Sequence, residues 1–397
     1  MKTHLSNKQL FLSFVGQTSA FPMAVEVARA EGIYLFSPEG KKYIDLISGI
    51  AVSSLGHNHP RLVRAVKEQA DKHMHVMVYG EFVQSPQAQL ANAISETLPK
   101  KLDNVFFVNS GSEAIEGAMK LAKRYTGRNK IVSCNKAYHG ATHGALSLSS
   151  EEVFKQGFMP LVPGIDFVDF GNERDLEHID RETAAVFIEP VQGEAGIRTA
   201  SKSYFQQLRQ RCDETGALLI FDEIQTGYGR TGQFWAFEHY GMVPDIITSA
   251  KGMGGGMPIG AFISSREIMS ALQTHPVLGH ITAFGGHPVS CAASLATLQE
   301  LREPKIYEQA EQKAGLFKKY LRHEKIREIR NLGLMMAVQF DSFEQVHKII
   351  QKSMHLGLIT DWFLFCDDAI RIAPPLIIAE EQIKEACELL LEAIETC

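Results

Sequence analysis

The sequence has no uninterrupted apolar stretch near the roughly 20 residues that a membrane-spanning helix needs. Its opening residues, MKTHLSNKQLFLSFVGQ, lack the apolar run of a secretory signal peptide. Its six cysteines form no C-x-x-C pair and no zinc-binding spacing, so we expect neither a disulfide framework nor a metal site. These absences are typical of a protein of the reducing cytoplasm, which is where we expect this one to work.

Basic residues are also fewer than acidic ones. The chain has 40 Lys and Arg against 46 Asp and Glu, which gives a formal net charge of −6. Nucleic-acid-binding domains usually show clustered basic residues and a positive balance. We therefore expect no nucleic-acid partner, and from the missing apolar span we expect no membrane partner.

The composition is otherwise that of a globular protein. Apolar residues make up 45% and charged residues 22%, values that exclude a disordered chain. A length of 397 residues allows two or three domains with full cores. Short apolar runs alternate with amphipathic helical stretches, a pattern that predicts an α/β layer with a largely parallel sheet. The four clearest predicted strands are 105–108, 184–188, 217–221 and 245–248.

The pattern changes from about residue 290, where long helical stretches at 305–324 and 380–396 dominate. Short strands at 334–340 and 369–373 accompany them, which indicates a second, α+β domain. Near the start of the chain, Pro38-Glu39-Gly40 predicts a turn between two strands. We divide the chain into an arm with part of the small domain (1–50), a large domain (51–289) and a C-terminal small domain (290–397).

Polar residues follow the predicted strands, at the sheet edge where α/β proteins bind ligands. After the first strand come Asn109, Ser110, Gly111 and Ser112, which lead directly into a helix. Small residues at such a turn expose backbone N–H groups to an anion, and a phosphate suits them. The alternative is an ordinary helix cap by Ser112.

Carboxylates follow two further strands. Glu189 and Asp222 stand directly after 184–188 and 217–221. Burying a lone carboxylate costs several kcal/mol, so each needs a cationic or hydrogen-bonding partner. Either they form structural ion pairs, or they belong to a functional site, where perturbed charges gather.

Lys251 follows the strand at 245–248 and precedes a glycine-rich run. Most lysines are solvated surface residues, but a lysine in a partly apolar cleft has a lowered pKa and can form a Schiff base. The run matches neither a phosphate-binding Walker loop nor a dinucleotide fingerprint. A phosphate site, an acid and a cleft lysine together suit pyridoxal 5′-phosphate, whose aldehyde needs the amine and whose ring nitrogen needs the acid.

Eight motifs, in this order, resemble those of the class III (omega) aminotransferases, which are pyridoxal-phosphate enzymes of fold type I. They are GHNHP at Gly56, NSGSEA at Asn109, YHG at Tyr138, EPVQGE at Glu189, DEIQTGYGRTG at Asp222, SAKGMGGGMPIGA at Ser249, FGGHP at Phe284 and RIAPP at Arg371. The resemblance implies a three-layer α/β/α large domain with a mainly parallel sheet, plus a smaller α+β domain. It also implies a homodimer with shared active sites.

The resemblance implies roles around the cofactor. Lys251 would be the Schiff-base lysine and the base that moves the proton, and Asp222 would pair with the pyridinium nitrogen. Gln225 would hydrogen-bond the phenolic oxygen, and Tyr138 would stack on the ring. The rest of the cofactor-binding set would be Ser110, Gly111, Ser112, His139, Glu189 and, from the partner subunit, Thr282.

The resemblance also implies roles toward substrates. Arg371 would bind the carboxylate of the amino acceptor, typically 2-oxoglutarate, and Glu194 would pair with it at other times. Ile50 stands where some relatives carry an aromatic that contacts substrate. Related enzymes for acetylornithine, ornithine and 4-aminobutyrate have an arginine after the YHG segment, where this chain has Ala141.

We therefore expect an aminotransferase that moves the amino group of an omega-amino acid or similar primary amine to 2-oxoglutarate by a ping-pong mechanism. Ornithine, N-acetylornithine and 4-aminobutyrate are the first donors to consider. One alternative is another pyridoxal-phosphate reaction on the same scaffold, by an aminomutase, racemase or decarboxylase. A second alternative is a non-enzyme that keeps only the scaffold, against which the intact Lys251, Asp222 and Gln225 argue.

Overall fold

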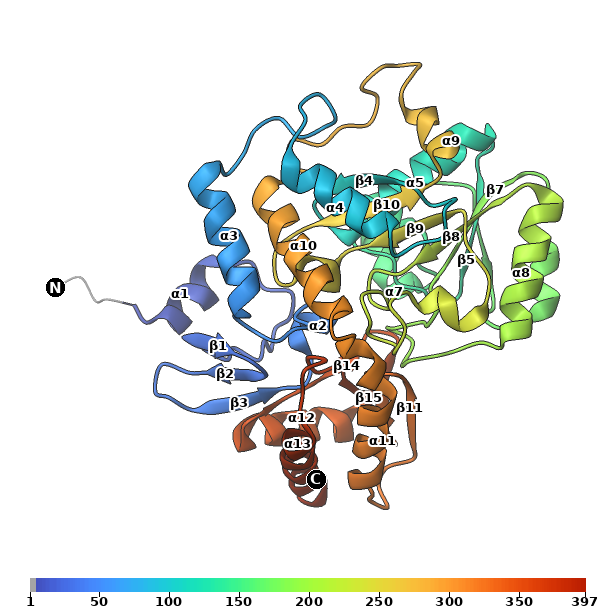
Figure 1. Cartoon of the computed structure of the whole chain (residues 1–397). Helices are drawn as coiled ribbons and strands as arrows, with labels where there is room; N and C mark the ends of the chain where they lie inside the picture. Colours follow the sequence, from blue (N-terminus) through green and yellow to red (C-terminus); the bar gives the residue numbers. More distant parts are fainter. Residues whose placement is uncertain (1–4) are drawn as a thin grey trace.

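The computed structural model describes residues 5–397, so the first four residues of the predicted arm (1–50) lie outside it. A seven-stranded sheet in the order β4-β10-β9-β8-β7-β5-β6 forms the larger part of the molecule (Figure 1). β10 is antiparallel to both of its neighbours and the other pairs are parallel. The strands are β4 (Asn104–Val108), β5 (Lys130–Cys134), β6 (Ile165–Val168), β7 (Thr183–Ile188), β8 (Leu218–Asp222), β9 (Ile246–Ser249) and β10 (Gly260–Ser264).

Helices cover both faces of this sheet. Along β7, Val186 belongs to a core that includes α8 (Lys202–Thr215), whereas its neighbour Phe187 belongs to a second core that includes α5 (Gly111–Thr126). Successive strand residues point to opposite faces, so two apolar faces require two covering layers. The predicted three-layer α/β/α arrangement with a mainly parallel sheet is confirmed.

The four predicted strands of this sheet are confirmed to within one residue at either end. Their residues are almost entirely buried, and short continuous apolar runs are typical of strands buried on both faces. The predicted turn at Pro38-Glu39-Gly40 is also present, since the Gly40 N–H donates to the Ser37 carbonyl at 3.0 Å between the strands on either side.

Two four-stranded sheets lie beside the large one. The first, β1-β2-β3-β13, joins N-terminal strands to a C-terminal one, because β13 pairs in parallel with β3. The second, β11-β12-β15-β14, is antiparallel. The strands are β1 (Arg29–Glu31), β2 (Tyr34–Phe36), β3 (Lys42–Asp45), β11 (Glu328–Leu332), β12 (Met335–Gln339), β13 (Leu358–Ile359), β14 (Asp361–Phe363) and β15 (Cys366–Ile372).

The remaining α-helices are α1 (Asn7–Phe14), α2 (Ser48–Ala51), α3 (Pro60–Lys72), α4 (Ser85–Ser95), α6 (His143–Ser147), α7 (Glu152–Lys155), α9 (Arg266–Met269), α10 (Pro288–Arg302), α11 (Ala310–Tyr320), α12 (Phe343–Leu356) and α13 (Glu380–Glu395). Figure 1 shows α11, α12 and α13 gathered at the end of the molecule that holds the smaller sheets. The helix predicted at 380–396 is confirmed by α13. None of the helices in residues 5–397 combines the length and the apolar character that a membrane crossing requires.

The single helix predicted at 305–324 is wrong. Lys305 takes the left-handed conformation (φ 59°) and a short 3₁₀ turn, Ile306–Gln309, precedes α11. A non-glycine residue in that conformation cannot continue a right-handed helix, so the helix begins only at Ala310. At the other end, the chain leaves helical geometry at Leu321.

The domain boundaries at residues 50 and 289 stay predictions. α10 begins at Pro288 and packs along α3 and α4, so the second boundary crosses the first turn of a helix.

Candidate active site

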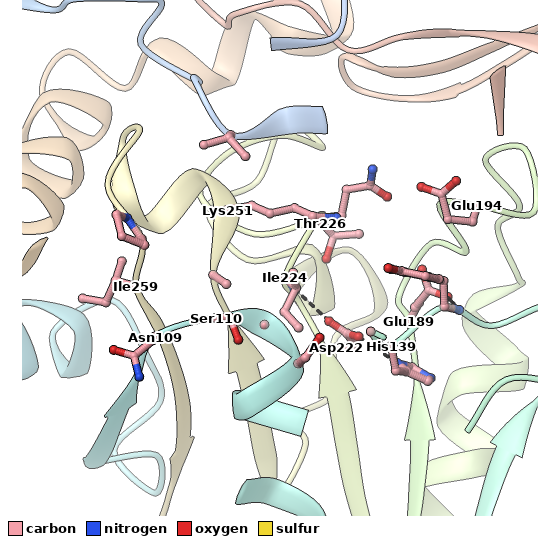
Figure 2. A pocket seen from close by; sticks show the side chains of 18 of the residues that line it. Asn109, Ser110, His139, Glu189, Glu194, Asp222, Ile224, Thr226, Lys251 and Ile259 are labelled. Carbon is pink, nitrogen blue, oxygen red and sulfur yellow. Dashed lines mark hydrogen bonds and ion pairs between the residues drawn. The ribbon is translucent and has the colours of Figure 1, made fainter. Parts of the chain in front are cut away.

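The site lies at the carboxyl edge of the large sheet. β4, β7, β8 and β9 run in the same direction, so the residues that follow them meet at one edge, as the sequence predicts. A cavity of about 410 Å³ opens there (Figure 2). Its lining includes ten of the predicted site residues: Ser110, Gly111, Ser112, Tyr138, His139, Glu189, Glu194, Asp222, Gln225 and Lys251.

Lys251 reaches into this cavity from the loop after β9. Figure 2 shows its side chain extending across the space above Asp222. Burial lowers the pKa of Lys251; the Glu194 carboxylate opposes that shift and the Arg371 guanidinium adds to it. Within residues 5–397, no side chain or backbone group hydrogen-bonds to its ammonium. A cavity lysine with a lowered pKa is a nucleophilic amine, so the surface alternative is wrong.

Asp222 ends β8 on the floor of the cavity and is 4% exposed. Its Oδ2 lies 2.7 Å from Nδ1 of His139, and its Oδ1 accepts from the Ile224 N–H at 3.0 Å. Burial alone would lower the pKa of His139, but the Asp222 carboxylate outweighs burial and raises it. The two hydrogen bonds orient the Asp222 carboxylate where a cationic ring nitrogen could meet it.

The first turn of α5 forms one end of the cavity. Ser110 is the helix cap and its Oγ accepts from the Glu113 N–H at 3.2 Å, so the alternative of a cap by Ser112 is wrong. The N–H groups of Gly111 and Ser112 belong to the first turn, where no helical carbonyl can accept from them. They face the cavity at the positive end of a 16-residue helix, which is a suitable site for a phosphate.

The segment Tyr138 to Ala141 packs directly on that turn. Gly140 has φ 134°, and a Cβ there would lie 2.2 Å from Oγ of Ser112. Only glycine allows this approach, so the sequence needs the glycine of its YHG segment to close the site. Ser112 Oγ also accepts from the Ala141 N–H at 3.3 Å, which joins the segment to the helix.

Glu189 holds two loops together. One carboxylate oxygen accepts from the Tyr138 N–H at 3.0 Å and the other from the Gly193 N–H at 2.9 Å. The carboxylate therefore lines the cavity, but both of its oxygens accept hydrogen bonds from backbone N–H groups. The geometry therefore favours neither an ion pair nor direct contact with a ligand for Glu189. Its carboxylate positions Tyr138 instead.

Gln225 is buried against Gly193, where a Cβ would lie 1.8 Å from Oε1 of Gln225. In the described chain its amide has no protein partner, so its hydrogen-bonding groups are available to a ligand in the cavity.

Arg371 lies behind the cavity wall and is 2% exposed, so the alternative of a surface arginine is wrong. Its guanidinium donates to both oxygens of Glu194, at 2.8 and 2.9 Å, and to Asp361 at 3.0 Å. Burial raises the pKa of Glu194, but Arg371 outweighs it and the net pKa is lowered. Burial raises the pKa of Asp361 to about 6. Glu194 faces the cavity, so it stands between Arg371 and any ligand there.

Besides Arg371, two predicted residues lie outside this lining. Ile50 sits in a strained segment (φ 63°), and its neighbour Val52 lines the cavity instead. Thr282 lies on another surface, where its Oγ1 accepts from the Gly285 N–H at 2.6 Å. A role for Thr282 in the site of a partner subunit stays a prediction.

The sequence reasoning missed several residues that build the site. Asp361 is the second carboxylate on Arg371, and no local pattern in the sequence singles it out. Lining residues that were also missed include Val52, Ile224, Thr226, Ala250, Met257, Pro258 and Ile259. In the part of the chain that the structure describes, no three His, Cys, Asp or Glu side chains are placed to hold a metal ion.

The residues present fit pyridoxal 5′-phosphate. An unpartnered lysine amine, an oriented carboxylate, a free amide and unpaired N–H groups at a helix N-terminus surround one cavity. These groups match the aldehyde, the ring nitrogen, the phenolic oxygen and the phosphate, respectively. Tyr138 and Ile224 supply flat or apolar surface for the ring between them.

Comparison with known proteins agrees with this geometry. The family model described as "Aminotransferase class-III" matches residues 15–394. The chain is 42% identical to the acetylornithine aminotransferase of Methanopyrus kandleri over 95% of each protein. It is 35% identical to the [LysW]-aminoadipate semialdehyde/glutamate semialdehyde transaminase of Sulfolobus acidocaldarius, over 93% of this chain and 94% of that protein.

Among solved structures, the chain resembles the ornithine aminotransferase of Toxoplasma gondii, which was crystallised with partial occupancy of pyridoxal phosphate at its active site. The TM-score is 0.90 at 29% identity, covering 97% of this chain and 92% of that one.

The burial of Glu189 predicts a specific dependence of stability on pH. Burial raises its folded-state pKa from 4.5 to about 7. A group whose pKa is raised in the folded state contributes fully to stability at pH values below its unfolded-state pKa. This contribution is lost as the pH rises through its folded-state pKa. The side chain of Glu189→Gln cannot ionise. The free energy of unfolding of this variant, relative to that of the wild type, should therefore rise between pH 4.5 and about 7 and stay constant above pH 7.

Urea unfolding at a series of pH values measures this difference. The exposed Glu182→Gln is the matched control and should show no pH-dependent difference. Parallel stability curves for Glu189→Gln and the wild type would contradict the assignment.

Proposed function

Because the chain belongs to the class-III aminotransferase family, and so is a pyridoxal-phosphate-dependent transaminase, we propose that its donor is an amine of the ornithine or N-acetylornithine type and its acceptor a 2-oxo acid, 2-oxoglutarate. The names of the acetylornithine and ornithine aminotransferases among its relatives support the donor class. The buried Arg371 supports a carboxylate-bearing acceptor.

A single observation carries the proposal: the amine of Lys251 has no protein partner in a cavity bounded by Asp222 and the first turn of α5. When bound, pyridoxal phosphate supplies an aldehyde that takes up the amine and a ring that accepts the electrons of the substrate carbon. Lys251 would hold the aldehyde, Asp222 would keep the ring nitrogen protonated, and Gln225 would bind the phenolic oxygen.

Lys251 also moves a proton. With the cofactor bound, the free Nζ of Lys251 would take the proton from the substrate carbon beside the nitrogen and later give it back. The lowered pKa leaves more of the amine in its neutral, basic form near neutral pH. Positioned proton transfer of this kind contributes roughly 10²–10⁴-fold in rate.

Arg371 and Glu194 let one cavity accept two different substrates. With a donor that has no carboxylate at this position, Glu194 neutralises the guanidinium through two hydrogen bonds. With a 2-oxo acid, Glu194 must turn away so that the acceptor carboxylate takes the same bidentate geometry. Asp361 keeps its hydrogen bond to Nε of Arg371 throughout, so the acceptor carboxylate replaces Glu194 only at the two Nη groups, which would be costly to leave buried without a partner.

Aminomutase, racemase and decarboxylase reactions use the same cofactor groups. The relatives are named as aminotransferases or transaminases, which favours transamination.

We also propose a homodimer with shared active sites, in the cytoplasm. Thr282 stands outside its own cavity, and its neighbours Ile281 and Phe284 are exposed, as is Val83 on a nearby segment. Exposed apolar side chains gathered in this way are typical of a surface that a partner covers.

The first prediction concerns Lys251→Ala. With N-acetylornithine and no acceptor, the wild-type holoenzyme should release about one equivalent of carbonyl product per site, because the amino group stays on the enzyme. Lys251→Ala should fold normally and release that product at least about 10²-fold more slowly. Rapid-quench analysis measures the release, and the exposed Lys318→Ala is the matched control. Release by Lys251→Ala at the wild-type rate would refute the assignment.

The second prediction concerns Arg371. Hydrogen bonds to charged groups contribute about 1.5–3 kcal/mol each, so Arg371→Lys, which keeps the charge but not the bidentate geometry, should raise the KM for 2-oxoglutarate at least about tenfold. The KM for the amine should change far less. Steady-state kinetics with both substrates varied separates the two values, and the exposed Arg327→Lys is the control. Equal changes in both KM values would count against the clamp.

A further inference from the structure

A second hollow, of about 260 Å³, adjoins the cavity on the far side of Tyr138. The two spaces share Tyr138 and Gly140 as lining residues, so they lie next to each other. The walls of the second space are largely apolar. They are formed by Leu146, Phe154, Phe158, Leu364 and Phe365.

No lysine or arginine of the described residues lines this hollow; His143, at its rim, is the basic residue present. Ala141 contributes only a methyl group to the lining. A carboxylate placed here would lose water without gaining a strong cationic partner, which costs several kcal/mol. The hollow therefore disfavours a charged substrate group and suits an apolar one.

Several of its walls are incompletely covered. Phe154, Phe158 and Leu364 are 39%, 58% and 42% exposed, respectively, although they stand together around one space. A ligand that covers these apolar side chains removes them from water, which stabilises the complex. The aromatic rings also supply edges and faces for another ring, as Phe154 and Phe365 do for each other at a centroid distance of 5.3 Å.

The wall at Leu364 and Phe365 is fixed to the catalytic cavity. The Leu364 N–H donates to Oε2 of Glu194 at 3.1 Å, and the Phe365 N–H donates to the Glu194 carbonyl at 3.0 Å. The same carboxylate neutralises Arg371. The apolar wall is thus held in place when Glu194 is paired with Arg371. We assign this pairing to the half-reaction in which the amine donor is bound.

We propose that this hollow binds an apolar, uncharged portion of the amine donor, an acyl or aryl group, and so selects donors by that group. The inference rests on the proposed function and names the donor class more closely. An N-acyl group of an ornithine-type amine meets the requirement, and an acyl group larger than acetyl fills the space better.

Two amines with the same spacer test the proposal. 3-Phenylpropylamine and 4-aminobutyrate both place three methylene groups between the nitrogen and the end group, which is a phenyl ring in one and a carboxylate in the other. In single-turnover reactions of the holoenzyme, 3-phenylpropylamine should have a kcat/KM at least about tenfold higher. An equal or higher value for 4-aminobutyrate would overturn the proposal.

Three variants locate the effect. Ala141→Arg places a cation at the entrance and should shift the ratio toward 4-aminobutyrate by at least about tenfold. Phe158→Ala should lower the value for 3-phenylpropylamine alone. Val153→Ala removes an 88% exposed apolar side chain outside the hollow, so it serves as the matched control and should change neither value. An unchanged ratio in both Ala141→Arg and Phe158→Ala would overturn the proposal.

A binding measurement separates this inference from the proposed function. 3-Phenylpropan-1-ol has no amine and cannot react, so calorimetric titration into the holoenzyme reports the hollow without turnover. Its dissociation constant should rise at least about fivefold in Phe158→Ala and stay unchanged in Val153→Ala. Equal affinity in Phe158→Ala and the wild type would contradict the inference even if transamination is confirmed, and the expected rise would support it even if neither amine reacts.

Discussion

The structure depends on one arrangement: a half-buried lysine amine that, among residues 5–397, has no hydrogen-bonding partner and lies where several strands of one sheet end. A buried ammonium without a partner is unfavourable, so its burial lowers the pKa and keeps a nucleophile available. The surrounding groups are oriented for the same cavity. Asp222 is fixed by His139, and the first turn of α5 points free N–H groups into the space. Each contact makes sense if a ligand with an aldehyde, a basic ring nitrogen and a phosphate occupies the cavity.

The buried charge at Arg371 is neutralised by carboxylates of the protein itself. Arg371 is buried with two carboxylates, Glu194 and Asp361, and only Glu194 faces the cavity. Because Glu194 also holds the Leu364 N–H, the carboxylate that would give way to an acceptor supports part of the apolar hollow. Under the proposed mechanism, a movement of Glu194 away from Arg371 would also remove the support of that wall.

Much of this could be predicted from the sequence because strand ends carry local signals. Buried parallel strands are short apolar runs, and the polar residues that follow them stand out, which located Lys251, Asp222 and the turn at Ser110. The helix predicted at 305–324 was wrong because its periodicity concealed a left-handed Lys305 after a proline. Its apolar spacing was right, but backbone conformation decided where the helix begins.

Contacts between distant segments gave no such signal. The Asp361 carboxylate on Arg371 and the apolar hollow depend on how β14, β15 and the segment after α6 come together, which no local pattern specifies. Likewise, Glu189 reads in the sequence as a candidate ligand, but its oxygens are taken by the N–H groups of Tyr138 and Gly193. The chemistry of the strand ends was predictable, whereas the division between ligand contacts and supporting contacts required the structure.

The most direct test of the central claim is borohydride reduction of the protein with its cofactor, followed by peptide mapping. Reduction makes permanent the bond between the cofactor and the amine that holds it. The account predicts that the label appears on the peptide that contains Lys251, and that an amine donor added before reduction prevents it. Label on a different lysine, or no label on a protein that has taken up the cofactor, would contradict it.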